Sequence, residues 1–300
     1  MKKEAEEGFG SSKDLNNVRF FKEDGTYNIQ RKGSLNGIRD VYKYLISINW
    51  LLFLSLVTLA FIAINLIFTG LFLVVGINGI TGIDNTLNDF WNAFFFSIET
   101  FTTIGYGALH PNSFGIHLIV VVESFLSIIS VAFITGLLYG RFSKPSSKIL
   151  FSDIVLFNEH NGKKAVMFKM VNARTSVLLN AKVKVMLMLN RTNDEGGMKA
   201  NHSLNLELDA ITFFPLTWTI VHSIDEKSPL WEMEFDDIIR LNAEVIVLVE
   251  AFDETHSQSI YKIKSYAGKQ WMNEKKFTRS FNADETGTIV LDINSINEII

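Results

Sequence analysis

The chain has 300 residues, enough for two domains of ordinary size, and 48% of its residues are hydrophobic. Its formal net charge is −4, no segment is basic enough to indicate nucleic acid binding, and the lack of cysteine excludes a disulfide framework. The 28 Lys and Arg are unevenly placed, with 9 before Trp50, 19 from Arg141 onward and none between. This distribution excludes a soluble single-domain protein and a disordered chain, and it indicates that residues 50–140 lie in lipid.

Elements in the first half of the chain are predicted from apolar periodicity and run length. Apolar residues at helical spacing within 38–46 predict a short helix at a membrane surface. Two apolar segments, about Ile48–Ile77 and Ile116–Tyr139, have the roughly 20 residues that a spanning helix needs. Basic residues flank them on the side of the termini: Arg39, Lys43, Arg141, Lys144 and Lys148. Because the loop at 78–113 has no Lys or Arg, we expect a multi-pass protein of the cell (plasma or inner) membrane with both termini in the cytoplasm.

Between the two spans lies a third apolar stretch, Phe90–Phe101 (FWNAFFFSIETF), which is too short to cross a bilayer as a helix. One interpretation is a re-entrant helix, which is tolerated only where irregular backbone is buried in protein or lines a watery cavity. The other is an amphipathic helix lying on the outer surface. Length and composition leave both interpretations open.

From Lys148 onward the hydrophobic pattern changes to that of strands. Runs rich in Val, Ile, Leu or Tyr occur at 181–189, 202–208, 243–252, 259–266 and 288–293, with turn-type residues such as Asn-Gly at 161–162 between them. Short strands at this spacing predict a β-sandwich of about 150 residues. The expected organisation is a cytoplasmic segment at 1–37, a helical membrane domain at 38–147 and a cytoplasmic β-sandwich at 148–300.

The string TTIGYG at 102–107 directly follows the short apolar stretch. A potassium selectivity filter replaces the water shell of the ion by rings of backbone carbonyls, one set from each of four subunits. Its backbone adopts conformations that most residues resist and that glycine, lacking Cβ, permits. We therefore expect a homotetramer whose filter consists of Thr103, Ile104, Gly105, Tyr106 and Gly107. The backbone of the first four binds K⁺, which is the permeant ion and not a cofactor, and the Tyr106 ring packs behind the filter.

Three strings carry a family resemblance: SIETFTTIGYG at 97–107, TIVHSIDE with SPL at 219–230, and RFFKEDGTYNI at 19–29. Through them the chain resembles the inward-rectifier potassium channels, in particular the prokaryotic members, from residue 18 to almost its end. The resemblance implies a slide helix, an outer helix, a pore helix, the filter, an inner helix and a cytoplasmic immunoglobulin-like β-sandwich. His222, in the second string, is better interpreted as a structural residue than as a metal ligand, because no second ligand lies at a usable spacing.

Two carboxylates at membrane depth are expected to support the filter. Eukaryotic members of the family pair the pore-helix acid, here Glu99, with an Arg after the filter, but in this chain Gly107 is followed by Ala108-Leu109-His110-Pro111. A buried carboxylate without a partner is costly, so we expect Glu99 to find backbone donors, Thr hydroxyls or a proton. Glu123, in the second span, is expected behind the filter near Glu99, either as a functional acid or as a protonated structural glutamate.

The second span carries candidates for the cavity and the gate. Ser127, Val131, Thr135 and Tyr139 are spaced by four residues and share one face of a helix. In the family this face lines the cavity, the position of Val131 carries an acid in strongly rectifying members, and the position of Tyr139 is the narrow crossing where the gate lies. Gly136 is the expected hinge.

The resemblance also makes Glu250 a pore-facing acid of the cytoplasmic vestibule, just before a loop that contains Asp253 and Glu254. Because Val131 is apolar, intracellular Mg²⁺ or a polyamine is expected to block the pore only weakly. The five basic residues that flank the spans are the expected contacts for an anionic phospholipid or phosphoinositide, with inhibition as the expected effect. The positive-inside rule alone also accounts for these charges.

The predicted function is passive, potassium-selective conduction through a tetrameric pore that is gated at the inner-helix crossing and modulated by anionic lipid. One alternative is a weakly selective cation channel, against which the TIGYG string argues. Another is a membrane-anchored sensor or binding protein, which would have no use for a re-entrant helix. An enzyme is disfavoured, because no nucleophile and base pair, phosphate loop or metal cluster is visible.

Overall fold

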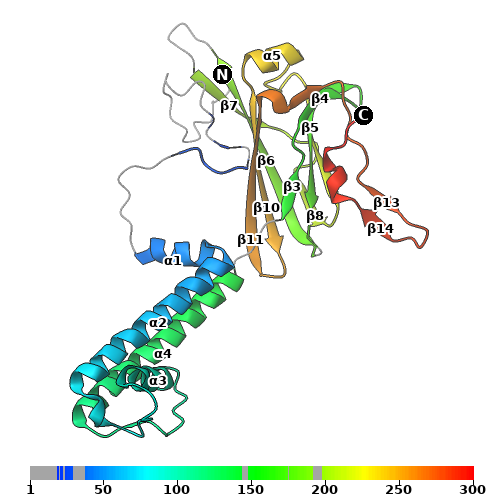
Figure 1. Ribbon diagram of the computed structural model, residues 1–300. Coiled ribbons are helices and arrows are strands. Elements are labelled where there is room, and N and C mark those ends of the chain that lie inside the picture. Colours follow the sequence, from blue (N-terminus) through cyan, green and yellow to red (C-terminus); the bar gives the residue numbers. More distant parts are fainter. Residues whose placement is uncertain are drawn as a thin grey trace. The chain divides into compact units, whose positions relative to one another are not determined.

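The computed structural model describes residues 38–143, 148–174, 176–191 and 198–300, together with Arg19 and residues 21–22 and 24–29 (Figure 1). The chain divides into two compact units, Gly33–Lys144 and Met1–Lys32 with Pro145–Ile300. We call them the helical unit and the β unit. The β unit includes N-terminal residues that the sequence suggests are a separate segment, because part of that segment packs on the sandwich.

Among its described residues, the helical unit has α1 (Ile38–Ser47), α2 (Trp50–Val75), η2 (Ile77–Gly79), α3 (Asp89–Phe101) and α4 (Phe114–Phe142). Side-chain caps begin three of the helices. The side chains of Asn49, Asn88 and Ser113 each accept a hydrogen bond from the backbone N–H three residues on. Each cap satisfies an N–H group that has no partner in the first turn of its helix.

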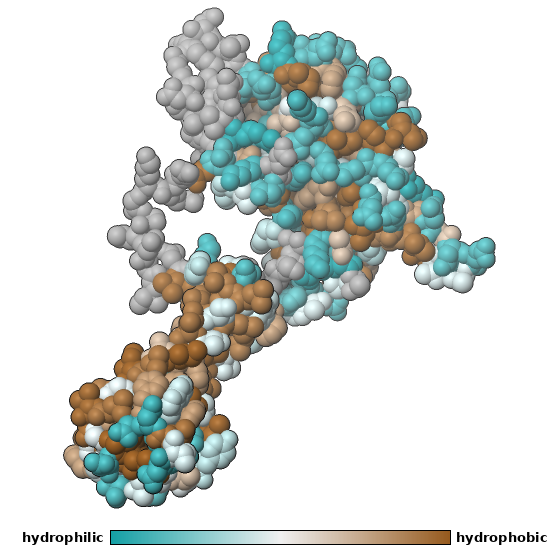
Figure 2. Space-filling model, viewed as in Figure 1, coloured by the Kyte–Doolittle hydropathy of each residue, from teal (hydrophilic) through white to brown (hydrophobic). Residues whose placement is uncertain are grey.

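Helices α2 and α4 are long and apolar enough to cross a membrane, with mean hydropathies of 2.6 and 2.4 in their most apolar windows. Only 17% and 11% of those windows are buried within the chain, which distinguishes both helices from the core helix of a soluble protein. Figure 2 shows apolar side chains, in brown, on the outside of this unit. Such a surface suits contact with lipid or with other membrane helices.

Helix α3 has 13 residues and is about 20 Å long, too short to cross the hydrocarbon core of ~30 Å. It packs against both spans: Phe96 lies with its ring centroid 5.0 Å from that of Phe72 of α2, and both belong to a buried cluster with Ile116 of α4. Beyond α3, strand β2 (His110–Pro111) pairs with β1 (Ile80–Thr81). Packing on two spans favours the re-entrant interpretation over a helix on the outer surface.

The β unit is a sandwich of two five-stranded sheets. One sheet has the order β11 (Gln258–Ala267), β10 (Glu244–Asp253), β6 (Leu178–Arg191) and β7 (Met198–Leu204), with β8 (Ala210–Phe214) also paired to β6. The other has the order β12 (Trp271–Asn273), β4 (Val155–His160), β5 (Lys163–Asn172) and β3 (Ile149–Phe151), with β9 (Thr217–Ser223) paired to β5. Outside these sheets lie α5 (Phe235–Arg240), η3 (Gly268–Gln270), η4 (Ile293–Asn297) and the hairpin of β13 (Phe281–Ala283) and β14 (Ile289–Leu291).

Alternation along the strands builds the core between the two sheets. Every second residue of a strand points to the same face. The inward-facing residues of β5, β6 and β10 accordingly join one buried cluster: Val166, Phe168, Met170, Val183, Val185, Leu187, Val245, Val247 and Val249. The intervening residues of β10, among them Glu244 and Glu250, therefore lie on the face turned away from the core.

One predicted strand is shorter in the structure. The alternating run at 202–208 forms strand only as far as Leu204, where β7 ends. The chain then leaves β6, and the N–H of Glu207 donates to the carbonyl of Val221 in β9 of the other sheet, at 2.9 Å. Period-2 patterning indicates an extended chain but does not specify how far it stays paired with one neighbour.

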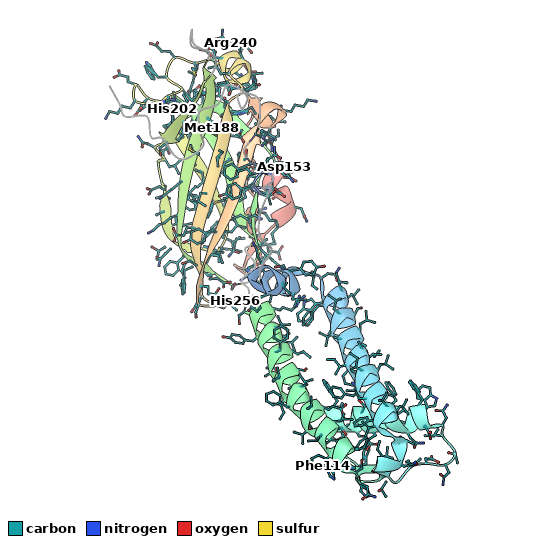
Figure 3. All side chains as sticks on the ribbon, turned by 90° about the vertical axis from the view of Figure 1, so that its left-hand side faces the viewer. Phe114, Asp153, Met188, His202, Arg240 and His256 are labelled. Carbon is teal, nitrogen blue, oxygen red and sulfur yellow. The ribbon has the colours of Figure 1, made fainter. Side chains whose placement is uncertain are left out.

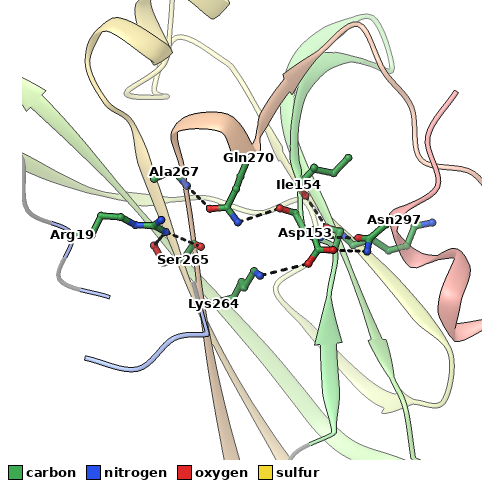
Figure 4. Close-up of polar contacts among 10 residues, drawn as sticks. Arg19, Asp153, Ile154, Lys264, Ser265, Ala267, Gln270 and Asn297 are labelled. Carbon is green, nitrogen blue, oxygen red and sulfur yellow. Dashed lines mark hydrogen bonds and ion pairs between the residues drawn. The ribbon is translucent and has the colours of Figure 1, made fainter. Parts of the chain in front are cut away.

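Part of the N-terminal segment lies on the outer face of the sheet that contains β10. Phe21 is buried there with Met188 of β6 and Ile246 of β10. Figure 4 shows the guanidinium of Arg19 against β11, where it donates to the Ser265 hydroxyl at 3.0 Å. These contacts explain why the segment groups with the β unit.

Candidate functional site

The predicted filter follows α3 directly and has an alternating backbone. The φ angles of Thr103, Gly105 and Gly107 are +58°, +49° and +84°, whereas Ile104 and Tyr106 between them have no positive φ. Positive φ suits glycine, which lacks Cβ, and so the two glycines fit their positions. Thr103 adopts the same region at a cost of about 1–2 kcal/mol.

The backbone N–H groups at the start of this segment bond to α3. Those of Ile104 and Gly105 both donate to the carbonyl of Glu99, at 3.1 and 3.3 Å. In a planar trans peptide the C=O points opposite to the N–H of the same peptide unit. The carbonyls of Thr103 and Ile104 are therefore directed away from α3, where a row of oxygen atoms can replace the water around a cation.

Filter side chains are exposed within a single chain. Tyr106 and Ile104 are 78% and 53% exposed, although both are large and apolar. Contiguous apolar surface of this kind indicates a contact with another molecule. One chain by itself leaves both side chains uncovered.

Comparison with known protein families covers both units. The model of the inward rectifier potassium channel transmembrane domain matches residues 21–145, and that of the inward rectifier potassium channel C-terminal domain matches residues 149–300, half of the chain. The chain belongs to the inward rectifier potassium channel family. It is therefore a membrane ion channel and not an enzyme, with a helical membrane part and a cytoplasmic β-sandwich.

Three relatives illustrate the similarity. The channel is 28% identical to inward rectifier potassium channel Kirbac3.1 of Paramagnetospirillum magnetotacticum, over 94% of this chain and 95% of the relative. It is 28% identical to inward rectifier potassium channel 18 of Homo sapiens, over 84% of this chain and 64% of the relative. It is 25% identical to G protein-activated inward rectifier potassium channel 2 of Rattus norvegicus, over 93% and 71%. The almost full-length match to the first relative agrees with a channel of the prokaryotic kind.

The two membrane carboxylates of the channel have different surroundings. Glu123 of α4 is fully buried, and its Oε1 lies 2.5 Å from the hydroxyl of Ser97 in α3. Ser97 is two residues before Glu99, so Glu123 lies against the pore helix near the end that carries the filter. The Oε2 atom of Glu99 is buried and has no hydrogen-bond partner among the described residues.

Asn65 of α2 was not predicted as a site residue. Its side chain is fully buried, and Oδ1 lies 3.0 Å from the Ser97 hydroxyl. A polar side chain at membrane depth is costly unless it is hydrogen-bonded, and it is by default a functional candidate. The signal available in the sequence was a single Asn within a run whose other polar residues are Ser or Thr.

Ser127 differs from the other residues of the predicted cavity face. Its hydroxyl donates to the carbonyl of Phe101, the last residue of α3, and its side chain is buried. Thr135 is exposed, and Val131 and Tyr139 are 61% and 75% exposed within the single chain. At 3.6 residues per turn, a row with a spacing of four drifts around the helix, and Tyr139 lies about 120° away from Ser127. Ser127, at one end of the row, is therefore bonded to α3, and the four residues do not share one face over the whole length of the row.

Arg141 has protein partners at the position where lipid contact was predicted. Its guanidinium donates to the carbonyls of Leu45 and Ile48, at 2.6 and 2.7 Å, and lies 4.5 Å from the ring centroids of Trp50 and Phe53. Carbonyls at a helix C-terminus lack intrahelical donors and carry partial negative charge. Arg141 therefore caps α1 and links it to the end of α4.

The other predicted lipid contacts are placed differently. Lys43 and Lys148 have exposed side chains, whereas the Arg39 side chain and all of Lys144 lie outside the described residues. The predicted hinge, Gly136, lies within the continuous helix α4, and a Cβ there would have no atom within 4 Å.

Glu250 lies on the face of β10 turned away from the sandwich core. It is partly exposed and accepts a hydrogen bond from the Tyr261 hydroxyl at 3.1 Å. Lys182 of β6 is its partner in the strand register, and the Lys182 side chain is exposed. A positive charge so close weakens the field that Glu250 presents to a cation.

Asp253 was predicted in the loop after Glu250, but it is the last residue of β10 and is fully buried. Arg174 donates to its Oδ2 at 2.5 Å, and His256 Nδ1 lies 2.8 Å from the same oxygen. Burial by itself would raise the pKa of Asp253, but the hydrogen bond from His256 and the charge of Arg174 outweigh it and lower the pKa. Figure 3 labels His256 at the turn between β10 and β11. Of the two acids expected in this loop, Glu254 is exposed and Asp253 is not.

His222 has protein partners at both ring nitrogens. Nδ1 lies 2.6 Å from the Asn205 carbonyl, and Nε2 lies 2.8 Å from the Ser228 hydroxyl. Burial lowers the pKa of His222. Within the described part of the chain no group of three or more candidate ligands could hold a metal ion. His222 thus joins β9 to two loops of the β unit.

Proposed function

We propose that the channel is a homotetramer that conducts K⁺ selectively along the backbone carbonyls of Thr103, Ile104, Gly105 and Tyr106, with both termini in the cytoplasm. The observation that carries the proposal is the alternating φ at 103–107 together with the N–H groups bonded to α3. This backbone leaves carbonyl oxygens free for an ion. The clustering of Lys and Arg on the terminal side of both spans supports the orientation.

Four copies are proposed because one strand supplies only a quarter of each carbonyl ring. The exposure of Ile104 and Tyr106 supports an assembly, since a neighbouring subunit would cover them. The exposed apolar side chains of α2 and α4 allow such contacts within the membrane.

The proposal is tested by ion flux into liposomes that contain the purified protein. We expect K⁺ to enter far faster than Na⁺, and chemical cross-linking to give a four-chain product. Comparable K⁺ and Na⁺ flux would instead support a weakly selective cation channel. A protein that forms tetramers but passes neither ion would support a sensor or binding role.

We propose that Val131, Thr135 and Tyr139 face the pore, with Tyr139 at the gate. The exposure of all three within the single chain supports this assignment. An apolar cavity at Val131 has no charge to hold intracellular Mg²⁺ or a polyamine. Glu250, beside Lys182, would add only a shallow site in the vestibule.

Val131→Asp is expected to increase spermine block at least about tenfold, because four carboxylates around one axis attract a multivalent cation strongly. The measurement is K⁺ current across a planar bilayer at several spermine concentrations and voltages. Val121→Asp is the matched control, since Val121 is on the same helix and is also exposed. Equal spermine block of the Val131 variant and the unmodified channel would show that Val131 does not line the cavity.

We propose that an anionic phospholipid or phosphoinositide inhibits the channel through Lys43 and Lys148, which are exposed. Each Lys near an anionic membrane surface contributes about 1 kcal/mol to binding. Arg39 and Lys144 are further candidates by their position in the sequence. Arg141 is proposed to act differently, by holding α1 to the end of α4. A displacement of α1 would then move the end of α4, near the proposed gate.

A further inference from the structure

Three polar side chains from three helices meet inside the helical unit, and a fourth is buried one turn further along α2. Asn65 and Thr69 come from α2, Ser97 from α3 and Glu123 from α4, and each is at most 1% exposed. Ser97 Oγ lies 2.5 Å from Glu123 Oε1 and 3.0 Å from Asn65 Oδ1, and the Thr69 hydroxyl donates to the backbone carbonyl of Asn65 at 2.6 Å. Burying polar groups in an apolar membrane costs free energy unless they are hydrogen-bonded. A cluster of this kind therefore calls for an account of every proton.

The direction of the hydrogen bonds follows from counting donors. Asn65 Nδ2 donates to the Phe61 carbonyl at 2.8 Å, which fixes the orientation of the amide and leaves Oδ1 toward Ser97. The Ser97 hydroxyl has one proton and faces three oxygens. Two are Glu123 Oε1 and Asn65 Oδ1. The third is the Asn65 backbone carbonyl at 3.3 Å, which already accepts a hydrogen bond from the Thr69 hydroxyl. If an ionised Glu123 accepted the hydrogen bond from Ser97, Asn65 Oδ1 would have no donor. The buried carboxylate would then have a single hydrogen bond.

With a neutral Glu123, each acceptor in this series of hydrogen bonds has a donor. Its carboxylic acid O–H donates to Ser97 Oγ, the Ser97 hydroxyl donates to Asn65 Oδ1, and the Asn65 amide donates to the Phe61 carbonyl. The other oxygen, Oε2, has no partner among the described residues, which costs less for a neutral carbonyl than for a carboxylate.

A second hydrogen bond lies one helical turn further along both α3 and α4. The hydroxyl of Ser127 donates to the carbonyl of Phe101, and the pairs Ser97/Phe101 and Glu123/Ser127 each have a spacing of four. Residues four apart lie on the same helix face. The two bonds thus fix the depth and rotation of α3 against α4, and Asn65 fixes α3 against α2.

We propose that Asn65 and a neutral Glu123 are positioning residues for the filter, which act through Ser97 and never touch the ion. The inference rests on the proposed filter function of 103–107. Helix α3 carries the Glu99 carbonyl that receives the Ile104 and Gly105 N–H groups. A shift of α3 would therefore move the carbonyls that select the ion.

The first experiment compares K⁺ and Na⁺ flux in liposomes for purified tetramers of each variant. Asn65→Leu keeps the side-chain volume but removes the acceptor for Ser97, and we expect the K⁺/Na⁺ flux ratio to fall about tenfold, as for the loss of one buried hydrogen bond. Glu123→Gln retains a neutral donor to Ser97, and we expect the ratio to change less than about twofold. Ser130→Ala is the matched control, because among the described residues the Ser130 hydroxyl bonds to the Leu126 carbonyl of its own helix and to nothing on another helix.

The pattern of ratios decides the inference. A Glu123→Gln variant as impaired as Asn65→Leu would show that the charge of Glu123 is needed and would overturn the neutral assignment. An unchanged ratio in Asn65→Leu would overturn the positioning role. The doubly substituted channel should lose no more selectivity than Asn65→Leu alone, because the substitutions act on one chain of hydrogen bonds.

A second measurement does not depend on conduction. The infrared spectrum of the unmodified tetramer should contain the carbonyl stretch of a protonated carboxylic acid that is absent from Glu123→Gln and shifted in Asn65→Leu. Lack of that band would overturn the neutral Glu123 even in a conducting channel. A band that is present in a protein without K⁺ selectivity would place the failure in the proposed filter function and not in the hydrogen-bond chain.

Discussion

Gly105→Ala is expected to abolish selective K⁺ conduction. Gly105 has a φ of +49°, a region that costs an L-residue about 1–2 kcal/mol, and the proposed tetramer would contain four copies of the substitution. The total of about 4–8 kcal/mol is enough to displace the filter from the conformation that its bonds to the Glu99 carbonyl maintain. The measurement is K⁺ and Na⁺ flux into liposomes at equal amounts of tetramer.

The matched control for this substitution is Gly70→Ala. Gly70 lies within α2, and apart from its chain neighbours and the backbone of its own helix a Cβ there would have no atom within 4 Å. Alanine is also the better helix former, so assembly and flux should be retained. Normal K⁺ selectivity in Gly105→Ala would mean that the left-handed conformation at this position is not needed for conduction.

Arg141→Gln is expected to uncouple α1 from α4. The variant loses the charged donors to the Leu45 and Ile48 carbonyls and the stacking of the guanidinium on Trp50 and Phe53. Hydrogen bonds from a charged group and contacts of a cation with aromatic rings together contribute about 3 kcal/mol. We expect a lower melting temperature of the purified channel and an altered K⁺ flux, with or without anionic lipid.

Arg141→Lys distinguishes geometry from charge. The lysine ammonium keeps the charge, but unlike a guanidinium it has no flat face to lie against two rings while it bonds two carbonyls. We expect it to behave almost like Arg141→Gln. Lys43→Gln with Lys148→Gln is the comparison, since both side chains are exposed, and it should weaken only the response to a phosphoinositide in the liposomes. An Arg141→Gln channel with normal stability and flux that lost only the lipid response would assign Arg141 to lipid binding.

Much of the fold could be predicted because its signals are contiguous in the sequence. Apolar run length indicated α2 and α4, and the structure places their ends within a few residues of the predicted ones. The short run at 90–101 was ambiguous between a surface helix and a re-entrant helix, since both have the same length and composition. Its contacts with Phe72 and Ile116 on two spans favour the second.

The site residues likewise divide into those indicated by neighbouring residues in the sequence and those whose position depends on packing. The positive φ at Gly105 and Gly107 agrees with the reason given for glycine in the predicted filter, and the assignment of 103–107 as the filter stays a prediction. The row from Ser127 to Tyr139 was predicted as one face, although its drift brings Ser127 to the pore helix. Asp253 was predicted in an acidic loop, but it ends β10 and is buried in an ion pair with Arg174, 79 positions earlier.

The sequence by itself determined the membrane spans, the strand-rich second half, the filter string and the family, since each depends on residues that are neighbours in the chain. Only the tertiary structure decided which polar groups meet. Ser97 lies 32 positions from Asn65 and 26 from Glu123, and Arg141 lies 93 to 96 positions from the carbonyls that it caps. Such pairs are set by the depth and rotation at which helices pack, which the 3.6-residue period leaves free.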